Sequence, residues 1–192
     1  LKLNQRLAEK LIYKKIKFKL GGNIKYFISG GAPLSYNVAE FFAALDVMIL
    51  EGYGLTETSP VLTASRPDKI KFGSPGLSLN NVEIKIAADG EILAKGPNIM
   101  IGYHNMEEET KEVFDQDGWF KTGDIGEIDK SGFLKITDRK KSLIVTSAGK
   151  NIAPAPLENA LNNSLYINQS MLIGDQKNFI SAIIVPSFED VK

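Results

Sequence analysis

Two glycine-containing segments, each directly after an apolar run, constrain most strongly what this chain can fold into. They are residues 29–34 (SGGAPL) and 52–57 (GYGLTE), and a stretch with helical spacing lies between them. We interpret the order as strand, loop, helix, strand and loop, which is a βαβ unit. Both loops then lie at the carboxyl ends of neighbouring parallel strands, where open α/β sheets bind ligands.

The residue types in these loops suit a nucleotide and a metal ion. The glycines allow the backbone to approach a flat or charged ligand closely. The Thr56 hydroxyl can meet a phosphate, and the Glu57 carboxylate can hold a hard cation. Tyr53 can lay its ring on a base. The alternatives are a half-buried core tyrosine at Tyr53 and a solvated carboxylate at Glu57.

Composition excludes several functional classes. The 192 residues include 23 Lys plus Arg and 23 Asp plus Glu, and a net charge of zero argues against a general nucleic-acid binder. The chain has no cysteine, which excludes disulfides and thiolate chemistry. No apolar stretch approaches the roughly 20 residues of a membrane span, and no signal-like segment opens the chain. We therefore expect a cytoplasmic location.

Residues 1–20 predict a helix, because their apolar side chains recur at three-to-four spacing. The other face of this helix is basic and carries Lys10, Lys14, Lys15, Lys17 and Lys19. Such a face is usually solvated, but it also suits peripheral contact with the inner surface of a membrane. Both interpretations stay open.

From about residue 60 the pattern changes to short alternating strands. Residues 82–94 and 126–137 each predict a hairpin, and a short helix begins near Asn105 between them. This block predicts a small antiparallel sheet or barrel. Beyond residue 141, three strands and a helix that starts at Pro156 predict a further α+β region.

Two later stretches add candidate binding residues. Asp124, at the entrance to the second hairpin, can accept hydrogen bonds from both hydroxyls of a ribose, although a turn-capping aspartate is the alternative. In the charged run 138–141 (DRKK), the rigid fork of Arg139 can contact phosphate or ribose. Lys141 can be an exposed pivot, whereas a solvated linker is the usual meaning of such a run.

Taken in order, several segments resemble the adenylate-forming acyl-CoA synthetase superfamily, most closely the AMP-forming long-chain fatty acyl-CoA synthetases. These segments are residues 29–34, 52–57, 102–103, 118–124, 138–141 and 149–152. The resemblance implies a ligase that activates a long-chain fatty acid with Mg-ATP to acyl-adenylate and then transfers the acyl group to coenzyme A. ATP or AMP, Mg²⁺, coenzyme A and a fatty acid are therefore the implied small-molecule partners.

The resemblance also implies nucleotide-binding roles in the first region. The backbone of Gly30, Gly31 and Ala32 would line the adenine. Tyr53 would stack on that base, and Gly54 would belong to the same site.

The remaining implied roles concern the phosphates, the ribose and the domain movement. Thr56 would contact phosphate and Glu57 would hold Mg²⁺. Asp124 would bind the ribose hydroxyls with the assistance of Arg139. The catalytic candidates that the resemblance implies are Thr56, Glu57 and Arg139. Lys141 matches the hinge position, and Gly149 would lie beside the channel for coenzyme A.

The implied fold is α/β with antiparallel β. Residues 1–138 would form the end of a large adenylation domain, with an α/β part at 1–65 and a β subdomain at 66–138. Residues 139–192 would begin a small α+β C-terminal domain. Because the family's phosphate-clamping loop and its C-terminal lysine have no match here, we expect a fragment that is inactive alone.

Two other functions stay open. Another adenylate-forming ligase, acting on a medium-chain or aryl acid or on an acyl-carrier protein, would share these segments. A non-catalytic AMP-binding module would keep only the nucleotide half-site. The loop at 147–151 (SAGKN) resembles the long-chain branch more than the luciferase-like branch, whereas acid length and oligomeric state have no signal in the sequence.

Overall fold

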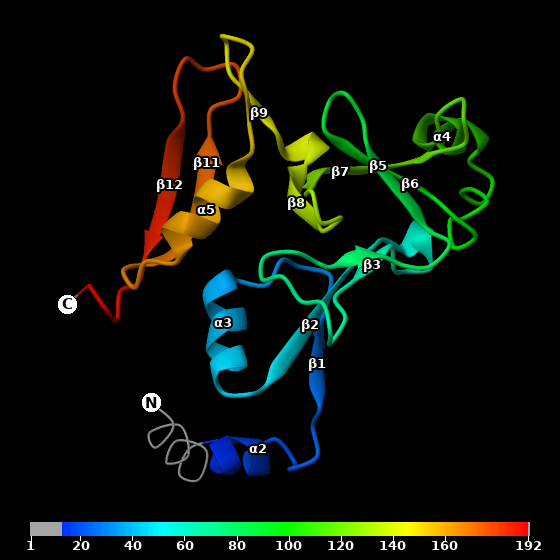
Figure 1. Cartoon of the computed structure of the whole chain (residues 1–192). Coiled ribbons are helices and arrows are strands. Elements are labelled where there is room, and N and C mark those ends of the chain that lie inside the picture. Colours follow the sequence, from blue (N-terminus) through cyan, green and yellow to red (C-terminus); the bar gives the residue numbers. More distant parts are fainter. Residues whose placement is uncertain (1–12, 192) are drawn as a thin grey trace. The chain divides into compact units, whose positions relative to one another are not determined.

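The computed structural model describes residues 13–191, and these form two compact units (Figure 1). Unit 1 holds residues 13–83, 94–110 and 128–135, and unit 2 holds residues 84–93, 111–127 and 136–191. Most of the helix expected over residues 1–20 lies outside the described residues, and α2 (Lys14–Lys19) is its described part. Across residues 13–191, no helix is both long enough and apolar enough to cross a bilayer.

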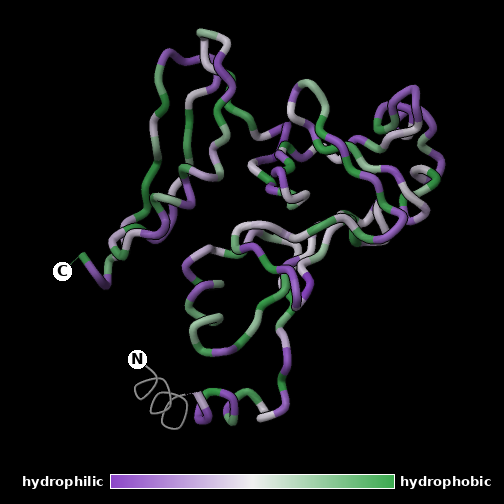
Figure 2. Tube along the Cα trace, viewed as in Figure 1, coloured by the Kyte–Doolittle hydropathy of each residue, from purple (hydrophilic) through white to green (hydrophobic). Residues whose placement is uncertain are grey.

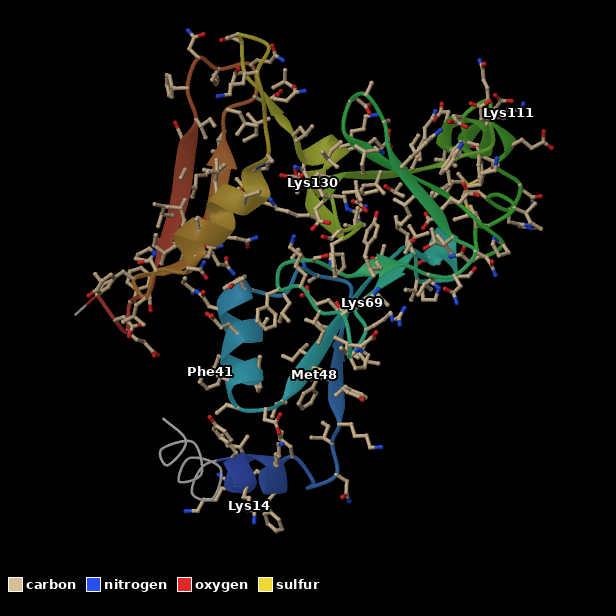
Figure 3. The ribbon with its side chains drawn as sticks, in the orientation of Figure 1. Lys14, Phe41, Met48, Lys69, Lys111 and Lys130 are labelled. Carbon is tan, nitrogen blue, oxygen red and sulfur yellow. The ribbon has the colours of Figure 1, made fainter. Side chains whose placement is uncertain are left out.

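Unit 1 contains the predicted βαβ unit. The strands β1 (Tyr26–Ser29) and β2 (Met48–Tyr53) pair in parallel, and the helix α3 (Tyr36–Ala44) connects them (Figure 1). Ala39 of α3 is buried, whereas Phe41, labelled on the same helix in Figure 3, is exposed. The pairing confirms the expected topology and ends both strands at one edge of the sheet.

Two short strands extend this sheet beyond β2. The strand β3 (Thr63–Ala64) runs antiparallel to β2, and β4 (Leu77–Ser78) runs antiparallel to β3, so that the order is β1-β2-β3-β4. Leu62 and Thr63 are fully buried here, and the Thr63 hydroxyl donates to the carbonyl of Pro75 at 3.0 Å. The sequence pattern does not predict β3 or β4.

A second sheet has the order β5-β6-β7-β8. Its strands are β5 (Glu83–Ile86), β6 (Glu91–Lys95), β7 (Phe120–Ile128) and β8 (Leu134–Arg139), with α4 (Glu107–Val113) between the second and third. The two predicted hairpins are therefore present, and the antiparallel block is confirmed. In unit 2 the rings of Phe114 and Phe120 pack with their centroids 5.7 Å apart.

The rest of unit 2 is a small α+β region. It contains η3 (Lys140–Ser142), the antiparallel strands β9 (Ile144–Val145) and β10 (Asn151–Ile152), the helix α5 (Pro154–Asn162), and the antiparallel pair β11 (Ile167–Ile173) and β12 (Ser181–Pro186). The helix packs on β11 and begins at Pro154, two residues before Pro156, where the sequence predicts its start. Figure 2 shows an apolar stretch along β12.

One carboxylate lies half-buried near the end of β2. Glu51 is opposite Ser29 in the parallel pair. Burial raises the pKa of Glu51 above its ordinary value, and the Leu34 N–H, which donates to the carboxylate, opposes that rise. The same hydrogen bond ties the end of the first glycine segment to β2.

A matched pair of glycine substitutions tests the packing of unit 1. Gly76 has a φ of 94°, and a Cβ added there would lie 2.1 Å from the carbonyl carbon and oxygen of Ala64. Gly73 has a φ of 77°, but a Cβ there would meet nothing within 4 Å. Since overpacking costs roughly 1–3 kcal/mol, Gly76→Ala should lower the free energy of unfolding by about 2 kcal/mol more than Gly73→Ala. Equal losses in denaturant titrations would contradict the close backbone approach.

A pH series tests the environment of Glu51. Glu51→Gln removes the half-buried charge and keeps an acceptor for the Leu34 N–H. A raised carboxyl pKa means that the folded state binds the proton more tightly, so the wild type loses stability as pH rises from 4.5 through the folded-state pKa. The variant should therefore match the wild type in Tm at about pH 4 and exceed it at about pH 7. A Tm difference that is independent of pH would contradict this account.

Candidate functional site

The two glycine segments lie side by side at one edge of the sheet in unit 1. A Cβ on Gly30 would be 3.6 Å from the carbonyl oxygen of Gly52, so the two backbones lie close together. Gly30, Gly31 and Ala32 are all exposed, and Gly31 has a φ of 83°. This edge therefore presents open backbone, as the sequence predicts for a surface that receives a flat ligand.

The second segment is a tight turn that is organised by packing. A Cβ on Gly54 would lie 1.8 Å from the carbonyl oxygen of Pro60, so only glycine fits at this position. The buried Thr58 hydroxyl accepts the Leu55 N–H at 2.9 Å and donates to the Pro60 carbonyl at 2.9 Å. Tyr53 is only 9% exposed. Gly54 and Tyr53 thus have a packing role in addition to the nucleotide-binding role that the resemblance implies.

Glu57 is oriented by a residue far away in the chain. The turn η2 (Thr56–Thr58) presents an exposed Thr56 and a half-buried Glu57. The Tyr103 hydroxyl donates to Glu57 Oε1 at 2.9 Å, and the Met100 N–H donates to the Glu57 carbonyl at 2.8 Å. Burial, and then the hydrogen bond to Glu57, raises the pKa of Tyr103. Gly102 and Tyr103 belong to the segments that carry the resemblance, but the sequence indicates no partner for Tyr103.

The Glu57 carboxylate fits a single contact to Mg²⁺. Its Oε1 accepts the Tyr103 hydrogen bond, while Oε2 accepts none from the described residues. Within residues 13–191, no three His, Asp or Glu side chains gather into a metal-binding group. Mg²⁺ is commonly held by one or two carboxylates together with water and substrate phosphates, so one oriented carboxylate suits a metal that arrives with a nucleotide.

In unit 2 the structure brings Asp124 and Arg139 together. Arg139 Nε lies 2.8 Å from Asp124 Oδ1, and the side chains are 64% and 5% exposed. The Asp124 N–H donates to the Thr122 hydroxyl at 3.1 Å, and that hydroxyl donates to the Ile92 carbonyl at 2.8 Å. Asp124 lies within β7 rather than in a turn, and its buried carboxylate is neutralised by an exposed arginine.

The next residue, Lys140, contacts two carboxylates of the hairpin formed by β5 and β6. Its ammonium lies 2.6 Å from Asp89 Oδ2 and 2.7 Å from Glu91 Oε2. The hydrogen bonds to Asp89 and then to Glu91 raise the pKa of Lys140, and the Lys140 bond lowers that of Asp89. Glu91 Oε1 also accepts the Gly123 N–H at 3.0 Å. The sequence indicates no role for these groups, and their only local signal is the turn at Asp89.

The other two residues of the charged run differ in their surroundings. The buried Asp138 accepts the N–H of Ala155, in the first turn of α5, at 3.1 Å, and the Arg139 N–H at 2.6 Å. A carboxylate in this position stabilises the start of a helix. Lys141 is exposed in η3, as expected for a pivot. Gly149 is exposed, with a φ of 74°, between β9 and β10.

Comparison with known proteins places this arrangement in a family. Residues 3–104 match AMP-binding enzymes, and residues 141–192 match the C-terminal domain of AMP-binding enzymes. The long-chain-fatty-acid–CoA ligase FadD15 of Mycobacterium bovis is 44% identical over 184 residues, which are 96% of this chain and 30% of that protein. The long-chain-fatty-acid–CoA ligase ACSBG2 of Gallus gallus is 39% identical over 189 residues, 95% of this chain and 25% of that protein. The chain thus spans less than a third of the length of these relatives.

Solved structures share the fold. An ATP-bound chimera of RpMatB and BxBclM is 33% identical, with a TM-score of 0.78 and coverage of 88% of this chain and 37% of the chimera. The O-succinylbenzoate coenzyme A synthetase MenE of Bacillus subtilis, in complex with ATP and magnesium ion, is 30% identical, with a TM-score of 0.74 and coverage of 91% of this chain and 40% of MenE. Since the first match alone takes in more than half of the 192 residues, the chain belongs to the family of AMP-binding enzymes.

Proposed function

We propose that the complete gene product that carries this chain activates a long-chain fatty acid with Mg-ATP to form acyl-adenylate and pyrophosphate, and then transfers the acyl group to coenzyme A. The observation that carries the proposal is the identity, along nearly the whole chain, to ligases named for this reaction. The solved relatives named for O-succinylbenzoate are less similar in sequence than those ligases. This ordering favours a long-chain acid over an aryl acid.

In unit 1, the edge beside β1 and β2 takes the adenine and the phosphates. The exposed backbone of Gly30, Gly31 and Ala32 supports a role against the base, on which Tyr53 would stack. The exposed Thr56 hydroxyl supports contact with a phosphate oxygen. The oriented Glu57 carboxylate would hold Mg²⁺, which when bound neutralises phosphate charge.

In unit 2, Asp124 takes the ribose. A fixed carboxylate can accept one hydrogen bond from each of the two vicinal hydroxyls. Arg139 is the exposed member of the pair and can move, so a nucleotide can reach Asp124 where Arg139 now lies.

The chemistry requires charge neutralisation more than proton transfer in its first step. A carboxylate oxygen of the acid attacks the α-phosphorus, and the bond to the bridging oxygen of pyrophosphate breaks. Thr56 and Arg139 would stabilise the charge that gathers on the phosphate oxygens. In the second step the coenzyme A sulfur attacks the acyl carbonyl carbon, its proton passes to solvent, and AMP leaves.

Lys141 would be the pivot about which the small C-terminal domain turns between the two steps. Its exposure in a short turn between β8 and β9 supports this role, because hinges are a few residues at the ends of elements that absorb changes in φ and ψ. Gly149 would then approach the pantetheine of coenzyme A in the thioester-forming state. The domain boundary proposed between residues 138 and 139 lies at the end of β8, just before this turn.

The reaction itself is tested with the complete gene product that carries this sequence. It should form acyl-CoA from ATP, coenzyme A and palmitate, with a kcat/KM higher for palmitate than for octanoate or benzoate. A preference for octanoate or benzoate would contradict the long-chain assignment. The absence of acid-dependent ATP–pyrophosphate exchange would contradict the ligase assignment as a whole.

Asp124→Ala tests the ribose role in the same protein. Loss of charge-assisted hydrogen bonds, worth about 1.5–3 kcal/mol, should weaken ATP binding by roughly tenfold or more, measured by calorimetry. Asp68→Ala is a matched control, because Asp68 forms an exposed pair with Arg66 in unit 1, and should leave ATP affinity unchanged. Wild-type affinity in Asp124→Ala would refute the role.

Lys141→Pro tests the pivot, because proline fixes φ near one value. It should impair either pyrophosphate exchange or thioester formation far more than the other. Lys130→Pro is the control: Lys130 is exposed (labelled in Figure 3) and is the second residue of a turn closed by the Gly132 N–H and the Asp129 carbonyl, where proline is tolerated. Equal loss of both half-reactions in Lys141→Pro would argue against a hinge.

A further inference from the structure

Glu91 is a buried carboxylate with both oxygens engaged by donors. Its side chain is 7% exposed. Oε1 accepts the backbone N–H of Gly123 at 3.0 Å, and Oε2 accepts from the ammonium of Lys140 at 2.7 Å. The family resemblance assigns no role to Glu91 or to Lys140.

The two partners of Glu91 flank the Asp124–Arg139 pair in sequence. Gly123 directly precedes Asp124, and Lys140 directly follows Arg139. Gly123 has a φ of 72°, so the peptide that leads into Asp124 has an unusual orientation. The Gly123 N–H, which belongs to the peptide before that glycine, donates to Glu91, whereas the Asp124 N–H donates to the Thr122 hydroxyl. The hydrogen bond to Glu91 therefore fixes the backbone one peptide before Asp124.

A carboxylate is the only side chain of this size that satisfies both partners. Gly123 and Lys140 offer donors only, whereas a carboxylate has two acceptor oxygens and a carboxamide has one. Burying an ionised carboxylate is costly unless it is paired and hydrogen-bonded. Asp89 on the same hairpin adds a second anion to Lys140, which fixes the ammonium between two carboxylates. Glu91 therefore does more than pack in the core: its two negatively charged oxygens bind both donors.

We infer that Glu91 is a positioning residue for the ribose site: through Gly123 it holds Asp124, and through Lys140 the backbone of Arg139, in the geometry that receives the two ribose hydroxyls. This inference rests on the proposed role of Asp124. Lys140 is the first residue of η3, so the same contacts fix where the backbone leaves the sheet before the proposed pivot.

The test compares the binding of AMP with that of 2′,3′-dideoxy-AMP, by calorimetry on the complete gene product. In the wild type, Asp124 should make AMP bind roughly tenfold tighter or more, because only AMP offers the hydroxyls. Glu91→Gln leaves one of the two donors facing the amide NH₂ group. It should reduce the preference for AMP by about fivefold, as expected for the loss of a good hydrogen bond, while the affinity for dideoxy-AMP changes little.

Three further variants make the result decisive. Asp124→Ala defines the preference that remains without the ribose carboxylate. Glu83→Gln, an exposed glutamate on β5, is the matched control and should keep the wild-type preference. Lys140→Met removes the contact between Lys140 and Glu91 at the lysine, whose side chain is 43% exposed. This variant should lower the preference for AMP even if Glu91→Gln fails to fold.

The outcomes separate the inference from the proposed function. If Asp124→Ala abolishes the preference while Glu91→Gln and Lys140→Met keep it, the positioning role is overturned and the ribose role stands. If the Glu91 and Lys140 variants weaken both nucleotides equally, Glu91 is merely structural and the inference is again overturned. If Asp124→Ala itself keeps the preference, the ribose role fails and the inference fails with it.

Discussion

Two carboxylates buried in one sheet, those of Asp124 and Glu91, require cations, and two consecutive residues supply them. Arg139 neutralises Asp124 and Lys140 neutralises Glu91. An unpaired buried carboxylate would be severely destabilising, so the segment that carries these cations is held against the sheet of unit 2. Asp138, just before them, stabilises the start of α5. A short charged run thus joins the candidate ribose site, the buried charges and the following helix.

Unit 1 depends on a different constraint, the parallel pairing of β1 and β2. This pairing brings the glycine segments to one edge, where the exposed backbone of Gly30 and Gly31 lies beside Gly52. The turn after β2 then presents Glu57, whose carboxylate Tyr103 holds by one oxygen. Each unit therefore offers an oriented carboxylate of different character: Glu57 is half-buried and suits a metal ion, whereas Asp124 is deeply buried and suits hydroxyl groups.

The local sequence pattern predicted most helices and strands, but it did not predict the contacts between residues far apart in the sequence. The βαβ unit and both hairpins follow from apolar periodicity and turn residues, which act over a few positions. The strands β3 and β4 have two residues each, too few to produce a period. Either Pro154 or Pro156 is acceptable in a first helical turn. The Glu57–Tyr103 and Glu91–Lys140 contacts join residues 46 and 49 positions apart, so neither partner has a local signal. The run at 138–141 resembles a solvated linker because sequence does not reveal buried carboxylates.

The most direct measurement of the central claim is a crystal structure of the complete gene product with AMP. The account predicts that the two ribose hydroxyls donate to the Asp124 carboxylate at O···O distances of about 2.5–3.0 Å, with the Glu91 contacts to Gly123 and Lys140 unchanged. Bound AMP whose ribose hydroxyls meet groups other than Asp124, while Asp124 stays paired with Arg139, would contradict it.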